Sequence, residues 1–204
     1  MYHVNNTKEC AVNAPAHVNP FLSGNYAPVR SEDNFTDLSI EGSIPPDLAG
    51  TFFRTGPNPQ FAPRDEKYHW FSGDGMIHAF RVESGKARYF NRYVRTPKWR
   101  AENEAGHALF GTFGNPLTTD PAWVGKDSGV ANTNILWHAG RLLALEEGHQ
   151  PFEMDPNDLA SRGYLDYAGA ANRFTAHPKI DPDTGELVFF GYMTGEVPLS
   201  NDMA

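Results

Sequence analysis

The sequence contains a single cysteine, Cys10, among its 204 residues. An internal disulfide is therefore excluded, and so is a metal site built from several thiolates. No stretch approaches the roughly 18 consecutive apolar residues that a membrane-spanning helix requires. Residues 1–20 are polar and lack the apolar run of a secretory signal peptide. These absences favour a cytoplasmic protein in which any metal is held by histidine and carboxylate.

Positive charge is also in short supply. The 17 lysine and arginine residues are outnumbered by 25 aspartate and glutamate residues, which gives a formal net charge of −8, and no basic run is present. Nucleic acids and anionic membrane surfaces are therefore poor partners. A chain of this length with 40% hydrophobic residues can bury the core of one domain, or of a large part of one. The sequence leaves the oligomeric state open.

Short strands joined by tight turns explain most of the apolar pattern. Runs of β-branched and aromatic residues are bounded by Gly, Asp and Pro turns, which is typical of β-hairpins. The expected strands are Thr51–Arg54, Met76–Val82, Lys86–Arg95, Thr133–Trp137, Arg141–Leu145, Thr175–Ile180 and Leu187–Tyr192. One helix is expected over Lys98–Phe110, and Gly106 weakens it. With 16 prolines and 19 glycines, this pattern predicts an all-β architecture such as a sandwich, a barrel or a propeller.

Two regions are expected along the chain. Residues 1–34 have no periodic apolar pattern and carry three prolines, so they are interpreted as an irregular N-terminal arm. Residues 35–204 are interpreted as the β domain. Residues 197–204 follow the last expected strand without a closing element, and the domain is therefore interpreted as truncated at its C-terminus.

The segment from Thr175 to Pro182 presents a histidine in a rigid setting. Pro178 lacks a backbone donor and restricts the preceding residue to extended geometry. The backbone therefore largely fixes the direction of the His177 imidazole. A fixed imidazole suits a metal site, because ligand geometry has to be set before the metal arrives. On the local sequence alone, a structural histidine at a strand end is the more frequent case.

Several motifs together resemble the carotenoid cleavage oxygenases, a family that includes the lignostilbene dioxygenases. They occur in the order expected for that family between Gly42 and Tyr192. The motifs are GSIPPDLAGTFFRTGPNP at 42–59, HWFSGDGMIH at 69–78, NRYVRT at 91–96, ANTN at 131–134, HAGRLLAL at 138–145 and AHPK at 176–179. A chance match of so many ordered motifs is very improbable.

The resemblance implies a seven-bladed β-propeller with a non-haem Fe(II) on its axis, held by four histidines, three of which are backed by glutamates. Family members cleave a conjugated C=C bond with O2 and release two carbonyl products. His177 corresponds to the first iron ligand, and Glu147 to one of the glutamates behind the ligands. The other three ligand histidines belong to the part of the family pattern that comes after residue 204. The chain as given is therefore expected to be inactive by itself.

The implied roles agree with the chemistry of the side chains. Imidazole suits Fe(II), and neutral ligands leave the metal its full positive charge for reaction with O2. Glu147 would accept a hydrogen bond from a ligand imidazole, which fixes the tautomer and raises the basicity of the ring. The neighbouring Glu146 is expected to be solvated, because adjacent side chains of a strand point to opposite faces.

Tyr93 and Lys126 provide the indication of a substrate class. Both positions resemble the tyrosine and lysine with which lignostilbene dioxygenases contact the 4-hydroxyl of a phenolic stilbene. An ammonium group lowers the pKa of a nearby phenol, and the resulting phenolate donates electron density into the alkene. Phe52 is a candidate lining residue of an apolar substrate tunnel. The ordinary alternatives are a solvated loop for Lys126 and core packing for Tyr93 and Phe52.

The hypothesis is thus an Fe(II)-dependent dioxygenase that splits a conjugated alkene, either an apocarotenoid or a lignin-derived stilbenoid. One alternative is a propeller that serves only as a non-catalytic binding scaffold. Another is that the 204-residue chain is itself an inactive open half-propeller, with exposed strand edges that invite aggregation. Three more histidines at strand ends of the complete protein would favour the enzyme.

Overall fold

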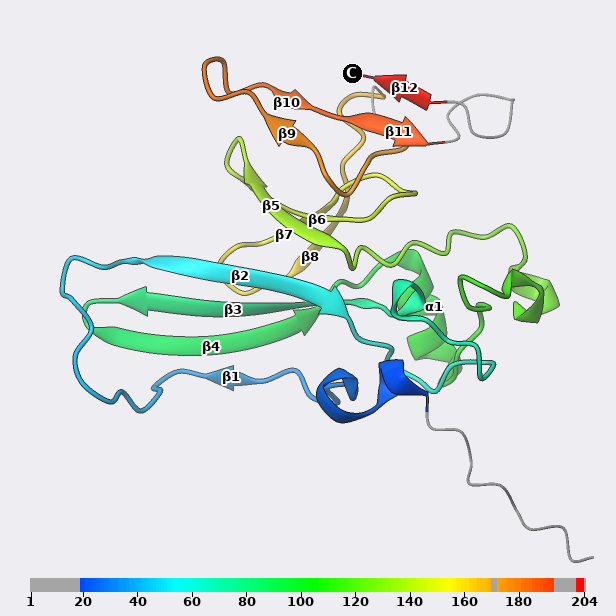
Figure 1. The fold of residues 1–204 in the computed structure, drawn as a ribbon, viewed down its shortest axis with the longest axis horizontal. Coiled ribbons are helices and arrows are strands. Elements are labelled where there is room, and N and C mark those ends of the chain that lie inside the picture. Colours follow the sequence, from blue (N-terminus) through cyan, green and yellow to red (C-terminus); the bar gives the residue numbers. More distant parts are fainter. Residues whose placement is uncertain (1–18, 170–171, 193–200, 204) are drawn as a thin grey trace, which may run out of the picture.

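The computed structural model describes residues 19–169, 172–192 and 201–203. These residues form mostly β-structure with few helices, which confirms the expected all-β class at that level (Figure 1). The helices are η1 (Pro20–Leu22), η2 (Gly24–Tyr26), η3 (Trp70–Ser72), α1 (Pro97–Ala105), η4 (Pro116–Thr118) and η5 (Pro121–Trp123). The strands are β1 (Asn34–Phe35), β2 (Gly50–Pro57), β3 (Gly75–Glu83), β4 (Lys86–Tyr93), β5 (Asn134–His138), β6 (Arg141–Leu145), β7 (Phe152–Met154), β8 (Ser161–Tyr164), β9 (Lys179–Ile180), β10 (Leu187–Val188), β11 (Phe190–Tyr192) and β12 (Asn201–Met203).

The first sheet contains four antiparallel strands in the order β1-β4-β3-β2. Its central hairpin pairs Glu83 with Lys86, so that Ser84 and Gly85 form a two-residue turn. Both turn residues have positive φ, 51° and 72°, as a type I′ turn requires. The sequence prediction of this hairpin is confirmed.

The second sheet, in the order β5-β6-β7-β8, lies above the first in Figure 1, and the side chains of its strand β6 after Arg141 are buried on both faces. Successive side chains of a strand point to opposite faces. Leu142 and Ala144 of β6 accordingly pack toward the first sheet, in one core with Ile77. Leu143 and Leu145 pack in a second core against the chain that follows β8. The continuous apolar run of β6 therefore reflects a strand enclosed between two layers.

The third layer contains two short antiparallel pairs, β9 with β10 and β11 with β12 (Figure 1). The strand expected over Thr175–Ile180 is wrong for its first four residues. The backbone amide of Thr175 donates to Phe190 O, and Ala176 O accepts from the side chain of Asn134. These contacts replace a strand ladder, and Pro178 cannot donate to one.

The helix α1 ends earlier than its apolar pattern suggests. Thr96 caps its first turn by accepting from Trp99 N, and Pro97 occupies the first helical position, where a missing amide does no harm. Gly106 adopts φ 75° and closes the last turn by donating to Glu102 O. The expected helix over Lys98–Phe110 is therefore too long, because Gly106 is its C-terminal stop.

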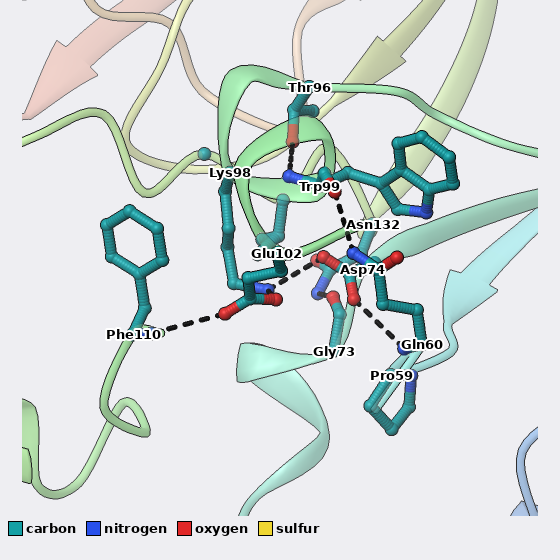
Figure 2. Close-up of polar contacts among 12 residues, drawn as sticks. Pro59, Gln60, Gly73, Asp74, Thr96, Lys98, Trp99, Glu102, Phe110 and Asn132 are labelled. Carbon is teal, nitrogen blue, oxygen red and sulfur yellow. Dashed lines mark hydrogen bonds and ion pairs between the residues drawn. The ribbon is translucent and has the colours of Figure 1, made fainter. Parts of the chain in front are cut away.

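A buried ion triad joins α1 to the turn before β3 (Figure 2). Lys98 Nζ lies 2.7 Å from Asp74 Oδ1 and 2.9 Å from Glu102 Oε2. All three residues are at most 7% exposed. Burial alone would lower the pKa of Lys98, but the attraction and hydrogen bonds of the two carboxylates raise it. Lys98 is therefore held as a cation.

The other carboxylate oxygens of the triad hold two loops in place by accepting hydrogen bonds from backbone amides. Glu102 Oε1 accepts from the backbone amides of Leu109 and Phe110. Asp74 Oδ2 accepts from Gln60 N, and Figure 2 shows this bond together with the one from Phe110. Each of the three charges in the triad thus has hydrogen-bond partners, which is the condition under which buried ions are tolerated.

Gly75 lies where the first sheet meets the segment before β5. Its amide donates to Val130 O at 2.7 Å, and a Cβ at this position would lie 2.3 Å from Ala131 O and 2.8 Å from Val130 O. Both neighbours are backbone atoms, so neither can move away cheaply.

We expect Gly75→Ala to lower the free energy of unfolding by about 1–3 kcal/mol or more, because it overpacks a rigid backbone contact. Gly56→Ala is the matched control, since a Cβ at Gly56 of β2 meets nothing within 4 Å. Denaturant unfolding of the two variants is the measurement. Equal midpoints for both would contradict the close approach.

The described part of the N-terminal arm packs along the first sheet. The amide of Val29 donates to Asn58 Oδ1, the amide of Asp33 donates to Asn91 Oδ1, and β1 extends the sheet beside β4. Residues 1–18, which include Cys10, lie outside the described residues. None of the described helices has the length and apolar character needed to cross a bilayer.

Candidate functional site

The candidate site lies where the end of β6 meets the segment between β8 and β9. Glu147 follows β6 after one residue, and His177 precedes β9 by two. The two segments are held together by the second core, in which Leu143 and Leu145 pack with Phe174 and Ala176. Packing of apolar neighbours on both segments therefore brings together two polar side chains that are 30 positions apart.

Three residues interact in this site. His177 Nε2 lies 3.1 Å from Glu147 Oε1. The Thr175 hydroxyl donates to Glu147 Oε2 at 3.1 Å and accepts from the His177 amide at 3.1 Å. The side chains of His177 and Glu147 are 64% and 40% exposed, whereas Thr175 is completely buried. The structure thus brings two of the predicted site residues, His177 and Glu147, into direct contact.

The chemistry of this pair suits a metal ligand and its supporting carboxylate. A neutral imidazole that donates from Nε2 to Glu147 keeps a lone pair on Nδ1. A carboxylate behind an imidazole is the usual way in which proteins fix a ligating histidine. Within the described residues, no group of three or more His, Cys, Asp or Glu side chains could hold a metal ion. An imidazole is a donor type that suits iron, and a site for that metal would need further ligands from outside these residues.

A second polar cluster, which the sequence did not predict, lies beside Glu147. Glu146 contacts His149 Nδ1 at 2.5 Å and accepts from Val130 N. His149 Nε2 lies 3.6 Å from Asp127, which also accepts from the hydroxyl of Tyr164. The expectation that Glu146 is solvated is wrong, because its side chain is only 13% exposed.

The carboxylates of Glu146 and Asp127 raise the pKa values of the two rings beside them. Burial alone would lower the pKa of His149, but the contacts with Glu146 and Asp127 outweigh it and raise the pKa. Burial also raises the pKa of Tyr164, and the nearby carboxylates add to the effect. The spacing of Glu146 and His149, three residues apart after a buried strand, is the local signal from which their contact could have been suspected.

Tyr93 is buried within the first sheet, at 8% exposure. Its hydroxyl accepts from Asn58 Nδ2 at 2.6 Å and lies 3.4 Å from Val29 O of the arm. Burial, with the nearby charge of Asp74, raises the pKa of Tyr93 to about 12. Its hydroxyl is therefore engaged inside the protein.

Lys126 and Phe52 lie on the surface. Lys126 is exposed in the loop after η5, where its amide donates to Trp123 O. Phe52 is 67% exposed on β2, opposite Phe80 of β3, so it is not a core residue. Among the hydrogen bonds and ion pairs of the described residues, none joins Tyr93 to Lys126.

The sequence also did not predict a contact between two exposed aromatic rings. Phe71 and Phe113 are 55% and 72% exposed, and their ring centroids lie 5.5 Å apart in an edge-on arrangement. Their backbones are fixed, because Phe113 N donates to Ser72 Oγ and Phe71 O accepts from Asn132 Nδ2. Phe71 belongs to the HWFSGDGMIH motif, which is the signal that could have drawn attention to it.

Comparison with known proteins gives consistent matches. The model of a family described as "Retinal pigment epithelial membrane protein" matches residues 26–202. Lignostilbene-alpha,beta-dioxygenase isozyme III of Sphingomonas paucimobilis is 44% identical over 173 residues, which cover 84% of this chain and 35% of that protein. Carotenoid 9,10(9',10')-cleavage dioxygenase 1 of Pisum sativum is 41% identical over 192 residues, which cover 84% of this chain and 35% of the relative.

A solved structure agrees with these matches. The crystal structure of Pseudomonas brassicacearum lignostilbene dioxygenase superposes with a TM-score of 0.79 at 39% identity, over 85% of this chain and 36% of that chain. The chain thus spans about 35% of the length of the curated relatives that it matches.

Proposed function

The chain belongs to the carotenoid oxygenase family, the family of the retinal pigment epithelial membrane protein, and we propose that the complete protein is an oxygenase that cleaves a conjugated C=C bond. The reaction we propose inserts the two atoms of O2, one at each carbon of the broken double bond, and yields two carbonyl compounds. The contact between His177 and Glu147 carries this proposal.

We propose that His177 is a ligand of one Fe(II) per complete chain and that Glu147 orients a ligand imidazole. When bound, iron would supply the activation of O2, which does not react with a closed-shell alkene unaided. Of the chain's own side chains, Glu147 would hold the proton on the imidazole nitrogen that faces it.

We further propose that the stacked sheets are successive blades of a seven-bladed β-propeller. The support is the arrangement of three layers with two apolar cores between them, since face-to-face packing of neighbouring sheets is what a propeller repeats around its axis. On composition, we place the protein in the cytoplasm, because a single cysteine is typical of a reducing compartment.

The substrate class that we propose is a small conjugated molecule, with phenolic stilbenoids preferred over apocarotenoids. The support is the identity of 44% to a protein named for lignostilbene. The exposed rings of Phe71 and Phe113 offer an aromatic surface of the kind that such a molecule contacts. Phe52 stays a proposed lining residue, and Tyr93 a proposed contact to the phenol.

The proposed role of Lys126 predicts a selective effect. If its ammonium contacts the phenol, Lys126→Met should reduce kcat/KM for 4-hydroxystilbenes by about 10–100-fold, the range for losing one hydrogen bond to a charged group. Turnover of apocarotenals, which lack a phenol, should change little. Equal loss on both substrates, measured under identical conditions, would remove Lys126 from the substrate site.

The activity itself is tested with the complete protein loaded with Fe(II). It is incubated under O2 with 4-hydroxystilbenes and with apocarotenals, and aldehyde products are detected by chromatography. Release of paired aldehydes is the expected result. If no substrate yields aldehydes while the protein still binds one of them, the non-catalytic scaffold is the correct interpretation.

A further inference from the structure

We propose that Thr175 is the positioning residue of the candidate site, because its hydroxyl sets both the carboxylate of Glu147 and the backbone of His177. This inference rests on the proposed function, since it concerns the pair that we assign to iron. In the sequence, Thr175 is the first residue of the segment that carries His177. The structure assigns it a contact with each member of the pair.

The hydroxyl of Thr175 both donates and accepts a hydrogen bond. A threonine hydroxyl has one proton to donate and lone pairs to accept with. Here it donates to Glu147 Oε2 at 3.1 Å and accepts from His177 N at 3.1 Å. One buried atom is therefore bonded to a side chain at the end of β6 and to the backbone before β9.

Thr175 is itself held from several sides. It is fully buried, as are its neighbours Phe174 and Ala176. Its amide donates to Phe190 O at 2.8 Å, and Asn134 Nδ2 donates to Ala176 O at 2.8 Å. A β-branched side chain also has restricted freedom about χ1. The position of the hydroxyl is thus determined by the surrounding structure.

Packing within the described part of the chain does not by itself fix the two residues that Thr175 contacts. There, the side chains of His177 and Glu147 are 64% and 40% exposed. With Oε2 of Glu147 bonded to Thr175, the carboxylate directs Oε1 to His177 Nε2. Without the hydroxyl, Glu147 gains freedom to rotate into solvent, and the imidazole loses the partner that selects its tautomer.

The test compares three variants of the complete protein. Thr175→Val keeps the shape and removes the hydroxyl, whereas Thr175→Ser keeps the hydroxyl. Thr112→Val is the matched control, because Thr112 is 3% exposed and its hydroxyl also contacts a carboxylate, Asp65 Oδ2 at 3.2 Å. The readouts are Fe(II) affinity by anaerobic titration and hydrogen exchange of the His177 amide in the metal-free protein, followed by mass spectrometry.

We expect Thr175→Val to weaken Fe(II) binding by about 10–100-fold, the usual effect of removing a group that supports a metal ligand. The His177 amide should exchange faster in the same variant. Thr175→Ser should restore both properties, and Thr112→Val should change neither. Wild-type affinity and wild-type exchange in Thr175→Val would overturn the positioning role.

Failure of the proposed function gives a different pattern. In that case the wild-type protein itself binds no Fe(II), which removes the metal assignment. The exchange measurement is made without metal, so it still decides whether Thr175 holds the backbone of His177. Loss of iron binding in Thr112→Val to the same extent would show a general loss of stability and would also overturn the specific role of Thr175.

Discussion

His177→Ala in the complete protein is expected to lose iron and activity together. Removing a group that only supports a ligand weakens metal binding by about 10–100-fold, so removing the ligand itself should weaken it by more than about 100-fold. The variant should therefore be purified with almost no iron and should release no aldehyde from any substrate. Metal analysis and product detection on the same sample measure the two effects.

The matched control is His107→Ala. His107 is exposed after α1, and the carbonyl of Ala105 is the one hydrogen-bond partner of its ring among the described residues. This variant should keep the iron content and turnover of the unaltered protein. If His177→Ala retained its iron while His107→Ala did too, the assignment of His177 as a ligand would be wrong.

Lys98→Met is expected to lower the free energy of unfolding by about 3–5 kcal/mol. Removing one partner of a buried ion pair leaves the remaining charges uncompensated. Asp74 and Glu102, both at 2% exposure, would then face each other without the cation between them (Figure 2). Two buried carboxylates without a counter-ion repel each other, and burial disfavours their charged forms. The loss should therefore shrink as the pH falls, since protonation removes the buried negative charge.

Denaturant unfolding at neutral and acidic pH measures both effects. Arg95→Met serves as the control, because Arg95 forms an ion pair with Glu32 near the same helix but is 46% exposed. An exposed pair contributes no more than about 1 kcal/mol. Equal losses in the two variants, or a loss in Lys98→Met that grows toward acid pH, would contradict the account of the triad.

Much of the fold could be predicted from local patterns. The hairpin of β3 and β4 has alternating side chains and a Ser84-Gly85 turn that accepts positive φ. The strand expected over Arg141–Leu145 is present as β6, and its last four residues are buried on both faces. The helix α1 ends before Gly106 and not at Phe110 as expected. The sequence alone does not distinguish a glycine inside a helix from one that ends it.

The contacts that matter most could not be predicted locally. Asp74 and Lys98 are 24 positions apart, and no periodicity relates them. Glu147 and His177 were named separately from a family resemblance, but their contact depends on how β6 packs against the segment around Phe174. The role of Thr175 is visible only after that packing is known. The sequence pattern also placed Glu146 in solvent, where tertiary contacts with Val130 and His149 bury it.

The most direct test of the central claim is the metal content of the complete protein, purified without air and without added chelator. The claim is that the imidazole of His177, with Glu147 beside it, belongs to a ferrous site. We predict about one iron per chain, with an X-ray absorption spectrum dominated by imidazole nitrogen, the ligand type that suits this metal. A protein that holds no stoichiometric iron, even after loading with Fe(II), would contradict the claim.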